Sequence, residues 1–278
     1  MSAYRFCRTD DIELLVDALN GCWAPYFPDE PLMTAAAFKR TIRDLQVWCS
    51  SCMVAFVGSD PIGVLIGARR PSGTLIHKIA VHPDHVRQGH GRHLLTSLSS
   101  KLAILGPPRI VAEIPETLVP ACALFNACGY VEEAVLTDYL SPDRQNDVPN
   151  AANRFIIPVT VDDLVANGLL GQSDAQVCWE RSVETLTARK DEMAGLAVAT
   201  DEQIEAYILY IGGGEIVALR SFVEDSGARL RQLLSRMGTG TFRLPKVHPA
   251  EMSKESLERL GFRVVGIHRF FAGKAQSQ

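Results

Sequence analysis

The segment from Val81 to Leu95 contains the residues best suited to binding chemistry. An apolar run, 75–81, leads into a polar stretch with Gly89 and Gly91, and leucines at helical spacing follow. Glycines let the backbone turn tightly and let a ligand approach without meeting a Cβ. The first N–H groups of a helix lack carbonyl partners, and the helix dipole is positive there. A strand, a glycine turn and a helix start therefore form a cradle for a phosphate or pyrophosphate.

Two common phosphate loops are excluded by the residues at this place. The chain has no Gly-x-x-x-x-Gly-Lys-Ser/Thr, and Leu94 stands where a dinucleotide fingerprint needs its third glycine. The segment resembles the acyl-CoA loop of the GNAT superfamily of N-acyltransferases, Arg/Gln-x-x-Gly-x-Gly/Ala. The family's loop often follows Val-x-Pro, as in Val81-His82-Pro83, and an apolar pair such as Leu94-Leu95 comes next. Val86 departs from the pattern, because it occupies the place of the leading Arg or Gln.

The resemblance continues downstream and covers roughly residues 50–140 well. A strand is predicted at 109–114, and 120–130 resembles the family's second CoA-side helix, which ends in an aromatic residue and then Gly-Phe or Gly-Tyr. The resemblance implies an α/β (α+β) fold, with a mixed, mostly antiparallel sheet flanked by helices. Strands are predicted at 53–57, 63–68 and 75–81.

Acetyl-CoA is the co-substrate that the resemblance implies. Local charge agrees with a ligand that carries several phosphates, because the span from Arg69 to Lys101 has six Lys or Arg and one acidic residue, Asp84. The residues that the resemblance assigns to CoA binding are Ile79, Ala80, Val81, Val86, Arg87, Gln88, Gly89, His90, Gly91, Arg92 and Phe125.

Acyl transfer to an amine needs a base, because an alkylammonium is protonated at neutral pH. His77 is the first candidate, since arylalkylamine acetyltransferases of the superfamily have a histidine at this place. Strand alternation would put His77 on one face with Ile79 and Val81. Glu113, on the adjacent predicted strand, is the second candidate and could act through water. The structural alternatives are a half-buried sheet histidine and an exposed strand carboxylate.

The general acid is missing from its family position. The family often has a tyrosine four residues before the glycine of Gly-Phe, and here that residue is Phe125, which has no proton to give. Tyr130 and Tyr139 are nearby in sequence, but no pattern places either at the thiol. Two hypotheses stay open: an N-acetyltransferase in which a primary amine attacks acetyl-CoA directly, and a non-catalytic acyl-CoA-binding or interaction protein.

Composition limits the partners and the compartment. The net charge is −4, which gives no case for nucleic acid, and no apolar run reaches the roughly 18 residues of a membrane span. The N-terminus lacks the apolar core of a signal peptide, and seven scattered cysteines indicate reduced thiols, so we expect a cytoplasmic protein. The acceptor is a small-molecule or peptide amine, a homodimer is compatible with the sequence, and the scattered histidines predict no metal site.

The second half of the chain faintly repeats the first. Residues 141–150 read as a linker, which gives an acyl-CoA-binding GNAT domain at 1–145 and a degenerate GNAT-like copy at 153–278. A tandem arrangement is also known in mycothiol synthase, while chance similarity between two α/β halves is the alternative. Glu224 and Asp225 bring negative charge to the copy's loop, so only the first domain is expected to bind CoA. Residues 153–159 could belong to either domain.

Overall fold

The computed structural model describes residues 2–142, 156–170 and 177–276. The chain divides into two compact units. Unit 1 consists of Met1–Glu133 and Arg269–Gln278, and unit 2 consists of Ala134–His268.

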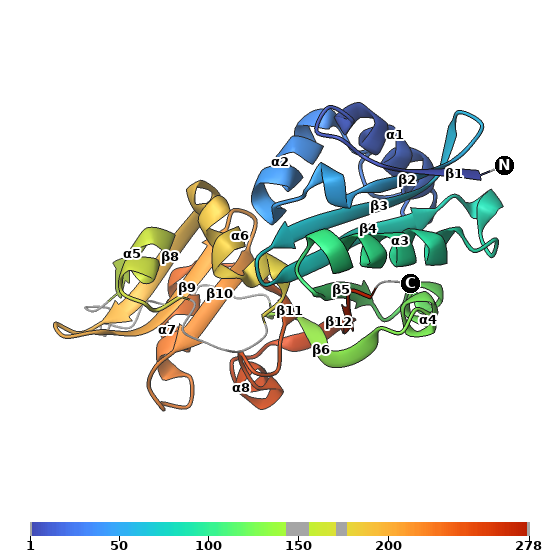
Figure 1. Cartoon of the computed structure of the whole chain (residues 1–278). Coiled ribbons are helices and arrows are strands. Elements are labelled where there is room, and N and C mark those ends of the chain that lie inside the picture. The colour runs from blue at the N-terminus through green and yellow to red at the C-terminus, as the bar shows by residue number, and fades with distance from the viewer. Residues whose placement is uncertain (1, 143–155, 171–176, 277–278) are drawn as a thin grey trace. The chain divides into compact units, whose positions relative to one another are not determined.

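Unit 1 is a mixed sheet with helices on both sides (Figure 1). Its strands lie in the order β1-β2-β3-β4-β5-β12, with antiparallel pairing from β1 to β4 and parallel pairing of β4 with β5. Helices α1 and α2 cover one face of β2–β4, and α3 covers the other (Figure 1). The elements are β1 (Ser2–Phe6), α1 (Ile12–Cys22), α2 (Ala35–Leu45), β2 (Met53–Val57), β3 (Asp60–Arg70), β4 (Gly73–Val81), α3 (His90–Leu105), β5 (Arg109–Pro115), α4 (Val119–Ala127) and β6 (Val131–Leu140).

The core of unit 1 lies between the sheet and α3. The leucines of α3 that the sequence places at helical spacing are buried there with Met53, Ile76 and Phe271; they are Leu94, Leu95, Leu98 and Leu102. Burial of this apolar stripe holds α3 against the strands, and it therefore fixes where the helix begins.

Unit 2 repeats the element order of unit 1. Its strands lie in the order β12-β6-β11-β10-β9-β8-β7, again with an antiparallel trio and one parallel neighbour, β10 with β11. The elements are β7 (Ile156–Pro158), α5 (Val161–Ala166), α6 (Val183–Ala188), β8 (Met193–Ala199), β9 (Ile204–Ile211), β10 (Glu215–Ser221), α7 (Ala228–Arg236), β11 (Arg243–Val247), α8 (Lys254–Arg259) and β12 (Arg263–Lys274). The mixed, mostly antiparallel fold and its duplication are thus as the sequence predicts.

The units do not follow the sequence-based division at 1–145 and 153–278. Strands β6 and β12 are long enough to contribute one end to each unit, so the last ten residues belong to unit 1 and residues 134–140 to unit 2. Strand β7 pairs with β8, which puts 156–158 in unit 2. Most of the predicted linker, and both boundaries at 145 and 153, lie outside the described residues.

The C-terminal strand is an integral part of unit 1. Phe271 is fully buried, its ring lies 5.9 Å from that of Phe125, and Arg269 pairs with Glu116 and Glu132. These contacts explain why residues far from unit 1 in sequence are needed to complete its core.

We expect Phe271→Ala to destabilise unit 1 by about 3–5 kcal/mol, the usual cost of removing a buried phenylalanine. Hydrogen exchange read by mass spectrometry should show the largest loss of protection in β4 and β5. The control is Phe222→Ala in unit 2, because Phe222 is 39% exposed. A larger loss in β8 and β9 than in β4 and β5 would contradict the assignment of β12 to unit 1.

Candidate active site

The loop between β4 and α3 has the backbone conformation of a tight ligand-facing turn. Gly89 is the N-cap of α3 with a φ of 89°, and Arg87 also has a positive φ, 62°. A Cβ at Gly89 would meet no atom within 4 Å, so glycine is required there by the backbone and not by crowding. Val86, Arg87, Gln88 and Gly89 are exposed.

The backbone N–H groups where this loop meets α3 make no backbone hydrogen bond in the part of the chain that the structure describes. Within the described residues, no backbone acceptor is found for the N–H groups from Arg87 to Arg92, and the first helical bond across the boundary runs from His93 N–H to the Gly89 carbonyl. Converging donors at a helix start favour an anion. The anion cradle stays a prediction, and the lack of backbone acceptors among the described residues agrees with it.

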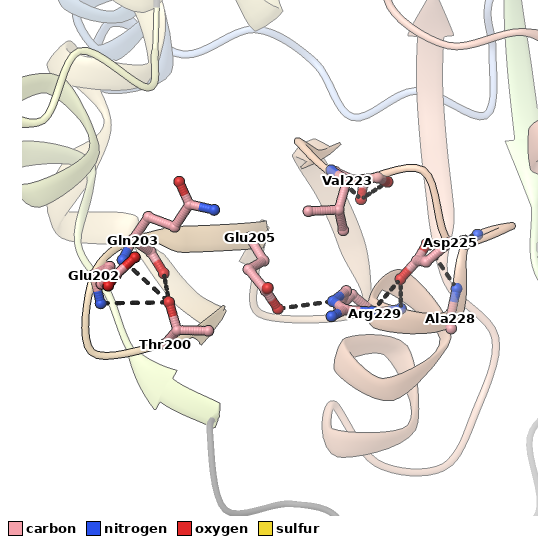
Figure 2. A network of polar contacts seen from close by, with 10 residues as sticks. Thr200, Glu202, Gln203, Glu205, Val223, Asp225, Ala228 and Arg229 are labelled. Atoms are coloured by element: carbon pink, nitrogen blue, oxygen red, sulfur yellow. Dashed lines mark hydrogen bonds and ion pairs between the residues drawn. The ribbon is translucent and has the colours of Figure 1, made fainter.

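Unit 2 has the corresponding turn, but there the donors are occupied. Gly227 is the N-cap of α7 with a φ of 80°. The Asp225 carboxylate accepts from Gly227 N–H at 2.9 Å, Ala228 N–H at 3.1 Å and Arg229 N–H at 2.8 Å (Figure 2). The Arg229 side chain in turn donates to Asp225 and to Glu205. A carboxylate of the chain itself thus fills the place where unit 1 offers free donors.

Strands β4 and β5 pair over only a short part of their length. The parallel pairs are Thr74 with Ile110 and Leu75 with Val111, and within the described residues no further pair is found. His77 and Glu113 each lie two residues past the last pair, on the two neighbouring strands. The structure therefore brings both candidate bases to the level at which the strands stop pairing.

The alternation assumed for β4 is wrong at His77. The register with β3 shifts between Lys78 opposite Ile66 and Ile76 opposite Gly67, so the shift falls at His77. Because of this β-bulge, Ile76 and Ile79 both pack into the core beneath α3, although strict alternation would separate them. Lys78 lies over the Trp23 ring, 4.0 Å from its centre. His77 therefore does not share a face with Ile79 through simple alternation; both His77 and Glu113 are half-buried.

Phe125 belongs to the core and not to a ligand surface. It is 1% exposed, and its ring lies 5.0 Å from Tyr130 and 5.9 Å from Phe271. A side chain buried this deeply presents no surface to a cofactor, which argues against the predicted CoA contact. Tyr130 and Tyr139 are also buried, and burial holds the pKa of each phenol above its ordinary value. Neither tyrosine is thus exposed, and Phe125 has no proton to donate.

Two tyrosines that the sequence analysis missed support the loop. The Tyr26 hydroxyl donates to the Val81 carbonyl at 2.7 Å. The Tyr4 hydroxyl lies 2.6 Å from His90 Nδ1, and the Tyr4 ring lies 3.8 Å from the ring of His93. Both contacts join residues at least 55 positions apart, so no local sequence pattern could indicate them.

The remaining predicted CoA-binding residues differ in exposure. Ala80 is buried, whereas Ile79 and Val81 are partly buried along β4. Arg92 is exposed in the first turn of α3, so its guanidinium is available to a ligand. Lys101, which ends the basic span that begins at Arg69, lies over the Phe6 ring and donates to the Ser50 carbonyl.

His90 makes the stability of unit 1 depend on pH. Burial, together with His85 and His93, holds the pKa of His90 below its ordinary value. The unfolded chain therefore binds a proton at about pH 6.5 before the folded chain does. The stabilisation is complete above that pH and is lost as the pH falls through the folded-state pKa.

We expect urea unfolding to show a steeper loss of stability below about pH 6.5 in the parent protein than in His90→Gln. The variant lacks the titrating ring but keeps a polar side chain near Tyr4. Parallel stability curves for the two proteins between pH 7 and pH 5 would contradict this prediction.

Three further properties of the described residues are a cavity, the grouping of possible metal ligands and the apolar length of the helices. A cavity of about 260 Å³ in unit 1 is lined from α3, residues 128–130 and the end of β12, and none of the predicted site residues lines it. Across the described ranges, no group of three or more His, Cys, Asp or Glu side chains is arranged to hold a metal ion. No helix among those residues is long and apolar enough to cross a membrane.

One stretch of the chain matches the model of a known protein family. Residues 12–130 match the model of the acetyltransferase (GNAT) family. This part of the chain, which contains the loop and both candidate bases, is therefore similar to GNAT acetyltransferases. No curated protein sequence matches the chain significantly.

Solved structures extend the similarity to the fold of the whole chain. A GCN5-related N-acetyltransferase from Sphaerobacter thermophilus has a TM-score of 0.68 at 14% identity, with 99% of this chain and 96% of that chain covered. A tandem GNAT protein from the clavulanic acid biosynthesis pathway has a TM-score of 0.63 at 14% identity, with both chains fully covered. A GCN5-related N-acetyltransferase from Anabaena variabilis has a TM-score of 0.66 at 12% identity, covering 99% and 73%. At these identities the likeness concerns the fold, which is that of a tandem GNAT protein.

Proposed function

We propose that unit 1 transfers an acetyl group from acetyl-CoA to a primary amine, and that unit 2 does not bind CoA. The observation that carries this proposal is the difference between the two helix starts. Among the residues that the structure describes, the donors from Arg87 to Arg92 have no backbone acceptor, whereas Asp225 occupies those of α7. A pyrophosphate suits the first site and would be repelled at the second by the Asp225 carboxylate.

The division of β4 from β5 supports a route for the acyl group. Backbone groups that no longer pair with a neighbouring strand are available to a ligand between the strands. Donor binding along β4 would bring the thioester to the level of His77 and Glu113. His77 would accept the proton of the amine as the amine attacks, and Glu113 would assist through water.

Cysteine chemistry supports direct attack by the amine over an acyl-enzyme. Burial holds the thiol pKa of Cys122 and Cys128 above the ordinary value, and a thiolate is the nucleophilic form. Neither thiol is therefore activated. We propose a small-molecule or peptide amine as the acceptor and a cytoplasmic location for the protein.

Phe125 stands where the family often has its general acid, and it has no proton to give. A second candidate function is therefore binding of acyl-CoA without transfer of the acyl group. Calorimetry with acetyl-CoA and a thiol-release assay over a panel of primary amines separate the two. Saturable binding with amine-dependent thiol release supports the transferase. Binding without release for every amine supports the second candidate, and absence of binding contradicts both.

A further inference from the structure

Unit 2 contains a cavity that the proposed acyl transfer does not use. Its volume is about 140 Å³, and it lies between residues 169–170, α6, strands β9 and β10, and residues 250–251. Most of its wall is aliphatic, with Leu186 and Leu219 among the lining residues. An apolar cavity of roughly 150 Å³ is large enough for a benzene ring.

One polar group at this cavity lacks a partner. The Arg181 side chain is only 5% exposed, and its Nε donates to Glu251 Oε1 at 3.1 Å. Its Nη1 is buried, and no described residue is hydrogen-bonded to it. A buried donor without an acceptor costs about 1–3 kcal/mol, and more when it carries charge. A ligand with an acceptor oxygen would remove that cost.

Charge around the cavity is not balanced. The lining includes two guanidinium groups, Arg181 and Arg220, against the single carboxylate of Glu251. Both Glu251 oxygens are already engaged, because Oε2 accepts from His248 N–H at 2.9 Å. Tyr207 is neutral at physiological pH, since burial raises its pKa to about 12. The cavity wall therefore carries one positive charge in excess.

We propose that this cavity binds a small monocarboxylate with an apolar body of about the size of benzoate. The carboxylate accepts a charge-assisted hydrogen bond from Arg181 Nη1, and the apolar body lies against Leu186 and Leu219. Such bonds are roughly twice as strong as neutral ones, which makes the carboxylate the group that distinguishes ligands here. This inference concerns unit 2 alone and does not depend on acyl transfer by unit 1.

Calorimetry of the full chain with benzoate, benzamide and benzylamine tests the proposal. Benzoate should bind saturably and at least tenfold more tightly than benzamide, and benzylamine should not bind. Equal affinity for benzoate and benzamide, or no saturable benzoate binding, would overturn the proposal.

Variants of opposite expected sign locate the site. Arg181→Met should weaken benzoate binding tenfold or more, and Glu251→Gln should strengthen it, because Arg181 then has no competing counter-ion. Arg229→Met is the matched control: this arginine of unit 2 is also ion-paired, with Glu205 and Asp225, but does not line the cavity. If Arg181→Met does not fold, the Glu251→Gln result decides, and weaker benzoate binding in that variant would overturn the proposal.

Discussion

Replacing Gly89 by glutamate is expected to abolish acetyl-CoA binding, with a loss of affinity of at least a hundredfold. The backbone at Gly89 has a φ of 89°, where a residue with a Cβ is strained by about 1–2 kcal/mol. The new carboxylate would also compete for the donors of the α3 start and repel a phosphate. Each hydrogen bond to a charged group is worth about 1.5–3 kcal/mol, and about 1.4 kcal/mol corresponds to a factor of ten.

Gly58→Glu is the matched control for this variant. Gly58 also has a positive φ, 61°, and a Cβ there would likewise meet no atom within 4 Å. It lies in the turn between β2 and β3, so it introduces the same charge and similar strain in unit 1 away from the loop. Calorimetry should show unchanged acetyl-CoA affinity for Gly58→Glu. A comparable loss in both variants would mean that destabilisation, and not the cradle, explains the result.

The Asp225 contacts allow a comparison of the helix starts of α7 and α3. In unit 2 the helix start is stabilised by a carboxylate that the sequence supplies two residues before Gly227. In unit 1 the corresponding place holds Arg87, two residues before Gly89, and no side chain takes the carboxylate's role. The N–H groups at the start of α7 are therefore satisfied by a carboxylate of the chain, whereas we propose that a bound phosphate satisfies those at the start of α3.

Local patterns were sufficient to predict the elements around the loop. Strand β2 was predicted at its observed bounds, 53–57, and the leucine spacing of α3 gave the buried face correctly. These features depend on residues within one or two turns of each other, so the sequence alone contains the needed information. The loop at Gly89 belongs to this class, because strand, glycines and helix are contiguous.

Features that depend on distant pairing could not be predicted in the same way. The bulge at His77 arises from the register between β3 and β4, and nothing in residues 75–81 indicates where the register will shift. The place of β12 in unit 1 depends on the fit of Phe271 into a core built from residues before 133. Tertiary packing decides both, so local alternation and a linker-like stretch of sequence do not contain the information needed to predict them.

Replacing His77 by alanine is expected to reduce turnover by about 10²–10⁴-fold while acetyl-CoA affinity is kept, since a positioned base contributes that much. The measurement is initial-rate thiol release with the best amine of the panel, combined with calorimetry of acetyl-CoA. His77→Gln separates the two roles that the bulge position allows. Glutamine can retain a hydrogen bond of a structural histidine, but it cannot accept the proton of the amine.

If His77 is the base, His77→Gln should be as slow as His77→Ala. If His77 has a structural role, glutamine should restore most of the rate. Glu113→Gln and the double variant complete the argument. If both residues handle the same proton, their effects on the rate are not additive, because removing one already abolishes the transfer that the other assists. Full additivity would instead assign Glu113 an independent effect. A wild-type rate in His77→Ala would contradict the assignment of His77 as the base.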